Sequence, residues 1–310
     1  MLSVKNVLDI DDLSVEDIEI VLENADTFNE VLERDLKKVP ALRGKTIINM
    51  FFESSTRTRI SFELAAKRLN ADIINFSSST SSLRKGESII DTIKTIRSMV
   101  ADLLIVRHGD SGVMDFIASN IDLPLINAGD GKHQHPTQAL LDLYTIRKSF
   151  SKFKDLDVAI AGDIVNSRVA RSNMLLFSKM GMNVTLVSAP MLLPEDLSHF
   201  NVNLTSCIDD IIRDTDVLYM LRMQFERQER KYYPSVNEYN RFLGLNEKRL
   251  NMMKKHSLVM HPGPVNRGIE ISEGVMNLED IKPENIKINE QVRNGVAIRM
   301  ALIYLILTKE

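Results

Sequence analysis

Cysteine is nearly missing from this chain, because Cys207 is the only one among 310 residues. An internal disulfide is therefore excluded, and no Cys/His group has the spacing of a zinc site. A reducing compartment is expected, and no metal site is expected.

A strong charge of one sign and a long apolar run are missing as well. The formal net charge of −3 gives no general attraction to nucleic acid or to an anionic membrane, so a basic cluster would act locally, on small anions. No apolar run approaches the roughly 18 residues that span a bilayer, and acidic residues follow the N-terminus within a few positions. We expect a cytoplasmic protein with no membrane anchor and no nucleic-acid partner.

The apolar residues, which make up 44% of the chain, form short runs separated by segments of helical length. The runs lie at 47–52, 73–76, 103–106 and 125–126, and again at 157–161, 184–187, 217–220 and 258–260. This rhythm is typical of βαβ units in parallel sheets. Ser14 and Asp17 indicate a capping box before an amphipathic first helix, and helical spacing recurs over 137–149 and 289–307. The sequence predicts the α/β class, with two doubly wound parallel-sheet domains joined by helices.

One segment combines the features of an anion site. Residues 54–59 read Ser-Ser-Thr-Arg-Thr-Arg and lie between the first predicted strand and a helical pattern. The N-terminus of a helix offers unpaired N–H groups and a fractional positive charge, which favour a bound anion. A Ser/Thr N-cap beside exposed arginines would explain one hydroxyl, but not two arginines among four hydroxyls. We therefore expect a phosphate-like dianion at this position.

Other polar residues follow the remaining predicted strands. They are Arg107, the segment 127–131 leading to His135 and Gln138, then Arg168, Arg222, Gln224 and the segment 261–264. Each one alone could be a surface ion-pair partner or a satisfied polar group. Because open α/β sheets bind ligands at the carboxyl ends of their strands, the joint placement favours a binding site.

These motifs resemble one family. Residues 52–59 (Phe-Glu-Ser-Ser-Thr-Arg-Thr-Arg) and 135–138 (His-Pro-Thr-Gln) are similar to the two carbamoyl-phosphate motifs of the carbamoyltransferases. The aspartate branch of that family has motifs that are similar to the segments 85–87, 127–131, 222–224 and 261–264 of this chain. The matches run in order from about residue 44 to 300. The resemblance implies a carbamoyl-phosphate-binding domain over 1–134 and 292–310, an aspartate-binding domain over 135–291, and an active site between them.

The resemblance also implies a role for each matching residue. Phosphate would be bound by Ser55, Thr56, Arg57, Thr58, Ser82, Lys85 and Arg107. Thr58, Arg107 and His135 would stabilise charge on the carbonyl oxygen, and a tetrahedral intermediate needs such fixed donors. Gln138 and the backbone carbonyls at Gly263 and Pro264 would accept from the carbamoyl NH₂, and a cis bond is implied before Pro264.

Aspartate, a small dicarboxylate, requires more than one planar cation, and Arg168 and Arg222 fit this need, with Gln224 and Lys85 beside them. Ornithine would require an acidic group, and the Ser-Met-Gly and His-Cys-Leu-Pro patterns of the ornithine branch are absent. Gly263 stands where other members often have leucine. This difference leaves the functional backbone carbonyl in place.

The serine-rich segment 77–87 reads as a solvated loop by composition. In the resembled family this loop enters a neighbouring subunit, so Lys85 and Ser82, with Ser81 as the alternative, would serve a shared site in a homotrimer. The implied activity is transfer of the carbamoyl group from carbamoyl phosphate to L-aspartate in pyrimidine biosynthesis, without a metal or organic cofactor. Regulatory chains or dihydroorotase are further partners that the sequence leaves open.

Three other functions are compatible with parts of the sequence. A carbamoyltransferase for another amino acid would share the phosphate half of the site. A dinucleotide-dependent dehydrogenase would also have two α/β domains, but residues 161–163 (Ala-Gly-Asp) lack the glycine fingerprint. A non-catalytic binding protein would have little reason to retain donors for two ligands.

Overall fold

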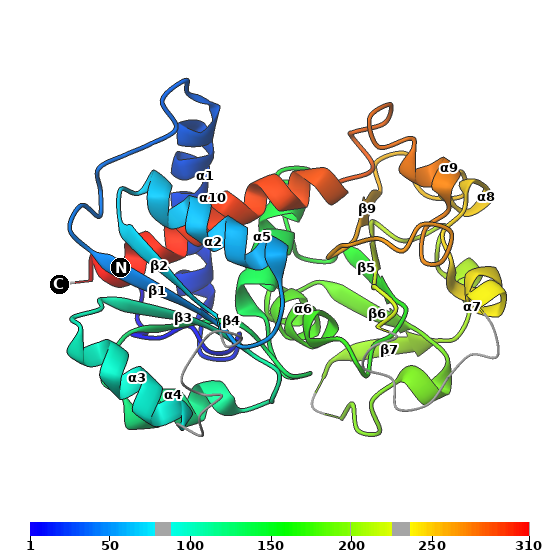
Figure 1. Cartoon of the computed structure of the whole chain (residues 1–310). Coiled ribbons are helices and arrows are strands. Elements are labelled where there is room, and N and C mark those ends of the chain that lie inside the picture. The colour runs from blue at the N-terminus through cyan, green and yellow to red at the C-terminus, as the bar shows by residue number, and fades with distance from the viewer. Residues whose placement is uncertain (78–87, 199, 225–235, 310) are drawn as a thin grey trace. The chain divides into compact units, whose positions relative to one another are not determined.

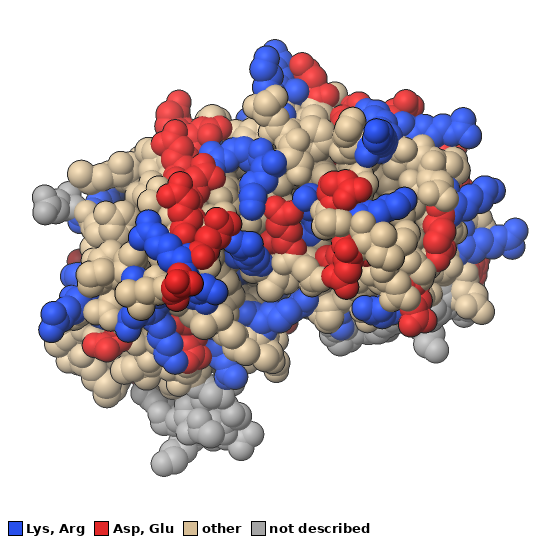
Figure 2. All heavy atoms as spheres, turned by 90° about the horizontal axis from the view of Figure 1, so that it is seen from above, with Lys and Arg blue, Asp and Glu red and all other residues tan. Residues whose placement is uncertain are grey.

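The computed structural model describes residues 1–77, 88–198, 200–224 and 236–309. Contacts divide the chain into two compact units, one of residues 1–141 with 293–310 and the other of residues 142–292. Among the helices in the described ranges, none combines the length and the apolar character needed to cross a membrane. Basic and acidic side chains are interspersed on the face seen in Figure 2, as the small net charge leads one to expect.

The first unit is built on a four-stranded parallel sheet with the order β2-β1-β3-β4. Its strands are β1 (Thr46–Phe51), β2 (Asp72–Ser77), β3 (Leu103–His108) and β4 (Leu125–Asp130). Its helices are α1 (Val15–Glu33), α2 (Thr56–Arg68), α3 (Ile89–Ser98) and α4 (Val113–Asn120), joined by the first residues of α5 (Pro136–Arg147) and most of α10 (Ile288–Leu307). In Figure 1, α2 and α10 lie on one side of this sheet and α3 and α4 on the other.

Local sequence explains where these helices begin. The predicted capping box of α1 is present, since the Ser14 hydroxyl accepts from Asp17 N–H at 3.0 Å while the Asp17 carboxylate accepts from Ser14 N–H at 3.2 Å. Helix α3 begins after the N-cap residue Ser88, whose hydroxyl accepts from Asp91 N–H at 3.1 Å. Such caps satisfy donors that a helix cannot bond internally.

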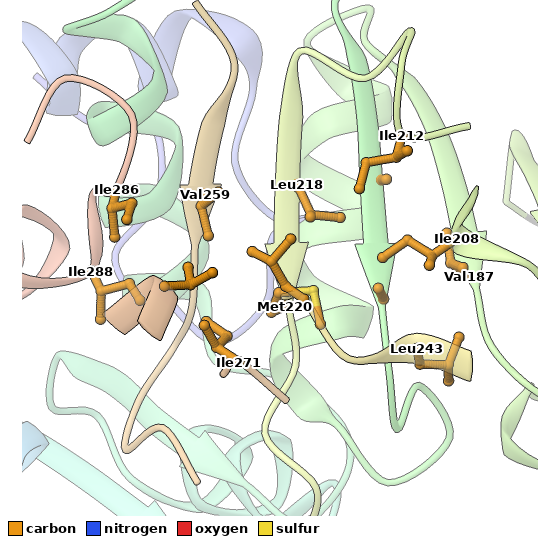
Figure 3. Packing of buried hydrophobic residues seen from close by; sticks show 14 of the residues in the cluster. Val187, Ile208, Ile212, Leu218, Met220, Leu243, Val259, Ile271, Ile286 and Ile288 are labelled. Atoms are coloured by element: carbon orange, nitrogen blue, oxygen red, sulfur yellow. The ribbon is translucent and has the colours of Figure 1, made fainter. Parts of the chain in front are cut away.

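The second unit holds a five-stranded parallel sheet with the order β7-β6-β5-β8-β9. Its strands are β5 (Asp157–Ala161), β6 (Asn183–Val187), β7 (Val202–Thr205), β8 (Val217–Met220) and β9 (Leu258–Met260). Its helices are α6 (Arg168–Lys179), α7 (Val236–Leu243), α8 (Glu247–Leu250) and α9 (Glu273–Met276), and two 3₁₀ turns, η3 (Pro190–Leu192) and η4 (Ile208–Asp210), complete it. Figure 3 shows part of its core, where Leu218, Met220, Val259 and Ile271 are fully buried.

The predicted α/β class with two all-parallel sheets is confirmed. Strand β7 was not predicted from the sequence; it is an edge strand with two exposed central residues, Asn203 and Leu204. A buried parallel strand reads as a continuous apolar run, whereas an exposed edge strand does not. This strand therefore lacked the signal that revealed the others.

The order of the strands identifies one position in each sheet where a ligand is expected to bind. The chain moves outward from β1 to β2 and then returns to pair β3 on the other side of β1, so β1 and β3 form a topological switch point. In the second sheet β5 and β8 have the same relationship. Ligands bind at the carboxyl ends of such strand pairs, because the connecting loops diverge there.

Candidate functional site

The carboxyl end of β1 leads directly into the predicted anion motif. Ser55 is the N-cap residue of α2, but its hydroxyl makes no capping hydrogen bond with the helix. The first turn carries Thr56, Arg57 and Thr58 and no acidic residue. Thr56 and Arg57 are exposed, and Ser55 and Thr58 are partly buried. Two threonines and an arginine at the positively polarised end of a 13-residue helix form a setting that favours an anion.

The carboxyl end of β3 brings Arg107 next to this motif. Phe51 pairs with Arg107 in the β1–β3 register, and Phe52 N–H donates to the Arg107 carbonyl at 2.9 Å. The guanidinium lies 3.3 Å from the Glu53 carboxylate, and its Nη1 donates to the Ala128 carbonyl at 3.1 Å. These contacts hold a cation close to the start of α2. A role for Glu53 was not predicted from the sequence, because an ion pair between residues 53 and 107 leaves no pattern among neighbouring residues.

His135 and Gln138 are placed by the loop after β4. Pro136 begins α5, a position where proline is favoured, and Gln138 N–H donates to the His135 carbonyl at 2.9 Å. His135 is buried, with 4% of its surface exposed, and Gln138 is partly buried.

A buried carboxylate organises this loop. Asp130 accepts from the Asn127 amide (2.9 Å), Gly112 N–H (2.9 Å) and Gln134 N–H (3.1 Å), and it lies 3.2 Å from His133 Nδ1. Burial acts to raise the pKa of Asp130, but the hydrogen bonds from its neighbours outweigh it and the pKa lies below its usual value. Asp130 therefore stays ionised and shapes the segment that leads to His135.

In the second unit, Arg168 is the first residue of α6. The helix begins after Ser167, whose hydroxyl accepts from Ala170 N–H at 3.1 Å. Only 3% of Arg168 is exposed. A buried guanidinium at the positive end of a helix adds a full charge to a fractional one, and this arrangement favours a bound anion.

The loops after β8 and β9 carry the remaining predicted residues. Arg222, Met223 and Gln224 follow β8, and Arg222 and Gln224 are partly buried. After β9 the peptide bond between Gly263 and Pro264 is cis, as the resemblance implied, and Gly263 has a φ of 66° that favours glycine.

The predicted residues thus fall into two groups within the described part of the chain. Ser55, Thr56, Arg57, Thr58, Arg107, His135 and Gln138 belong to the first unit, and Arg168, Arg222, Gln224, Gly263 and Pro264 to the second. Ser82 and its alternative Ser81, together with Lys85, lie outside the described residues. Over the described ranges no group of three or more His, Cys, Asp or Glu side chains has the arrangement of a metal site.

Family models match both halves of the chain. Residues 5–148 match the aspartate/ornithine carbamoyltransferase carbamoyl-P binding domain, and residues 154–306 match the Asp/Orn binding domain of the same family.

Curated relatives agree with this match. The aspartate carbamoyltransferase catalytic subunit of Campylobacter hominis is 50% identical over 300 residues, which cover 96% of each chain. The protein of the same name from Syntrophotalea carbinolica is 48% identical over 302 residues, or 97% of this chain and 95% of the relative.

Solved structures give the same result. Aspartate transcarbamoylase from Trypanosoma cruzi in complex with N-(phosphonacetyl)-L-aspartic acid matches with a TM-score of 0.87 and 29% identity, covering 96% of this chain and 94% of that one. The catalytic subunit of M. Jannaschii aspartate transcarbamoylase matches with a TM-score of 0.83 and 34% identity, covering 98% of both chains. This chain therefore belongs to the aspartate/ornithine carbamoyltransferase family.

Proposed function

We propose that this chain transfers the carbamoyl group from carbamoyl phosphate to L-aspartate and releases N-carbamoyl-L-aspartate and phosphate, a step of pyrimidine biosynthesis. The observation that carries the choice of aspartate is the pair of arginines in the second unit, Arg168 at the start of α6 and Arg222 after β8. The relatives named above are aspartate carbamoyltransferases, and one T. cruzi structure contains both carbamoyl phosphate and aspartate.

Carbamoyl phosphate would bind at the start of α2. Its dianionic phosphate needs several donors, and Ser55, Thr56, Arg57 and Thr58 supply hydroxyls, a guanidinium and first-turn N–H groups. We assign this role to a carbamoyl-phosphate-binding domain over 1–134 and 292–310, with Ser82 and Lys85 as further donors.

The chemical step places negative charge on the carbonyl oxygen when the amine of aspartate attacks the carbamoyl carbon. Thr58, Arg107 and His135 are our candidates for stabilising this charge. The guanidinium of Arg107 is already oriented by Glu53 and by the Ala128 carbonyl, so little reorganisation is needed as charge develops. The departing phosphate can accept the amine proton, and we assign no side chain as the base.

The remaining roles concern the orientation of the two substrates. Gln138 and the carbonyls of Gly263 and Pro264 would accept from the carbamoyl NH₂. In an aspartate-binding domain over 135–291, Arg168 and Arg222 would bind the two carboxylates, with Gln224 and Lys85 beside them. Ornithine has an ammonium group on its side chain, which two arginines would repel. Catalysis then depends on placing two small molecules correctly, without a metal or organic cofactor.

We further propose a cytoplasmic homotrimer with active sites shared between subunits. Exposed apolar side chains in the first unit support self-association, since Ile60 and Leu64 lie one turn apart on α2 and Ile74 lies on the edge strand β2. Regulatory chains and dihydroorotase are additional candidate partners. Sedimentation of the purified chain, with and without cell extract, tests these assemblies.

The activity is tested by supplying carbamoyl phosphate with L-aspartate or with L-ornithine and measuring both phosphate release and the carbamoylated amino acid. We expect stoichiometric N-carbamoyl-L-aspartate and no reaction with ornithine above the rate of spontaneous hydrolysis. Preference for ornithine would overturn the aspartate assignment and leave the phosphate half intact. Absence of turnover with any amino acid would favour a non-catalytic binding protein.

A further inference from the structure

Glu270 is a fully buried carboxylate in the second unit with no role in the proposed chemistry. Its Oε1 accepts from Met223 N–H and from the Asn266 side-chain amide, each at 2.7 Å. Its Oε2 accepts from Asn266 N–H, also at 2.7 Å. The Asn266 amide in turn reaches the Met223 carbonyl at 3.4 Å. Glu270 therefore joins two loops that follow different strands.

The first of these loops carries the proposed aspartate-binding residues. Met223 lies between Arg222 and Gln224, and its N–H and carbonyl are bound by Glu270 and Asn266. Its side chain is 2% exposed and packs in the hydrophobic core. Because the backbone and the side chain of Met223 are both held, the Cα positions of its neighbours Arg222 and Gln224 are fixed as well.

The second loop carries Gly263 and Pro264. His261 N–H donates to Gln291 Oε1 at 2.9 Å, and His261 Nδ1 accepts from Gly263 N–H at 2.8 Å. Because Nδ1 is an acceptor, the ring proton lies on Nε2, which is 3.9 Å from Glu270 Oε2. The same carboxylate thus faces the segment that presents the Gly263 and Pro264 carbonyls.

The sheet itself cannot align these loops. Strands β8 and β9 are paired from Val217 with Leu258 to Tyr219 with Met260, and the pairing ends there. Past that point the connections of parallel strands diverge, and other hydrogen bonds must set their spacing. Glu270 and Asn266 supply bonds across this gap.

We propose that Glu270 is a positioning residue whose carboxylate, without touching substrate, holds the loop of Arg222 and Gln224 in register with the loop of Gly263 and Pro264. This inference rests on the proposed function. A carboxylate suits the position because it only accepts hydrogen bonds and meets three donors. A glutamine of the same size would turn an NH₂ group toward one of those donors.

The cost of the buried charge supports a role beyond stability. Burial raises the pKa of Glu270, and hydrogen bonds from Met223 and Asn266 offset only part of that effect. An uncharged glutamine would avoid the cost, but its NH₂ group would replace one of the two oxygens that now accept from three donors.

The test compares Glu270→Gln with Glu279→Gln in the full chain. Glu279 is a matched control, because it is a buried carboxylate of the same unit, burial likewise raises its pKa, and it accepts from Asn289 N–H at 2.6 Å without bonding to either loop. For Glu270→Gln we expect the KM for aspartate to rise and kcat to fall, each about tenfold or more. Equilibrium binding of carbamoyl phosphate should change less than about threefold, since its phosphate donors lie in the other unit. Glu279→Gln should resemble wild type.

A second variant, Asn266→Ala, keeps the proposal testable if Glu270→Gln does not fold. Asn266→Ala removes the side-chain bonds to Glu270 and to Met223 while leaving the carboxylate, so we expect the same effects on KM and kcat with a smaller size. Wild-type kinetics in a folded Glu270→Gln protein, or equal losses in Glu279→Gln, would overturn the positioning role. If Glu270→Gln does not fold, an unchanged KM and kcat in Asn266→Ala would overturn it. A wild-type protein that prefers another amino acid would refute the proposed function alone, and the same comparison with that amino acid would still test Glu270.

Discussion

Glu53 and Arg107 form an ion pair at the carboxyl ends of two adjacent strands, with 3.3 Å between Glu53 Oε2 and Arg107 Nη2. Their side chains are 27% and 12% exposed, so solvent screens the pair less than a surface ion pair. The Ala128 carbonyl accepts from the other terminal nitrogen of the guanidinium at 3.1 Å. Arg107 is therefore held from two sides.

Replacing Glu53 with alanine should reduce kcat by about tenfold, because the guanidinium loses its orientation toward the developing oxyanion. Affinity for carbamoyl phosphate should stay the same or increase, since a negative charge near a dianion has been removed. Glu63→Ala is the control, because Glu63 is an acidic residue of α2 whose pair with Lys67 lies on the surface. An unchanged kcat in Glu53→Ala would mean that Arg107 needs no such support.

Arg57→Ala should weaken carbamoyl phosphate binding by about 2–4 kcal/mol, because a charge-assisted contact to a dianion is lost. Turnover should fall as well. Calorimetric titration of the folded variant with carbamoyl phosphate measures the effect. Near-normal affinity would remove Arg57 from the site.

Arg222→Ala should sharply raise the KM for aspartate while leaving equilibrium binding of carbamoyl phosphate nearly unchanged. The combined loss in kcat/KM could reach several kcal/mol, because a misplaced amine also loses its attack geometry. Unaltered kinetics for aspartate would contradict the carboxylate assignment. Lost carbamoyl phosphate binding in a folded protein would place Arg222 in the other half of the site.

Lys85→Ala and Arg57→Ala should complement each other if Lys85 acts in a neighbouring subunit. Each parent should be nearly inactive, and mixed, dissociated and reassembled subunits should regain activity, because some sites then contain both intact residues. The measurement is turnover of the hybrids against each parent treated in the same way. Correctly assembled hybrids without activity would disprove a shared site.

Glu279→Gln should stabilise the protein at neutral pH. Burial raises the pKa of Glu279 above its usual value of 4.5, so the folded state binds this proton more tightly than the unfolded state. Stability then decreases as pH rises from about 4.5 through the folded pKa, and the ionised carboxylate is a cost above that window. Glutamine can still accept from Asn289 N–H. We expect a higher thermal midpoint than wild type at pH 7.5 and a smaller difference near pH 4.5. A pH-independent difference would exclude this titration as the cause.

Much of the fold could be predicted from the sequence because buried parallel strands are continuous apolar runs, as at 158–161 and at Leu258–Met260. The anion-binding motif could be predicted as well, because Ser55 to Thr58 are consecutive and one helix terminus sets their geometry. β7 was missed because its central residues are exposed at the edge of the sheet.

The α/β class, the strand-end motifs and the family follow from the sequence, since each depends on residues close together in the chain or on their order along it. Tertiary structure alone decided which carboxylates support those motifs. Glu53 meets Arg107, Asp130 collects donors from Gly112 and Asn127, and Glu270 reaches Met223, 47 positions away. The sequence does not distinguish a solvated carboxylate from a buried one. Only the folded chain brings together the hydrogen-bond donors that surround a buried carboxylate.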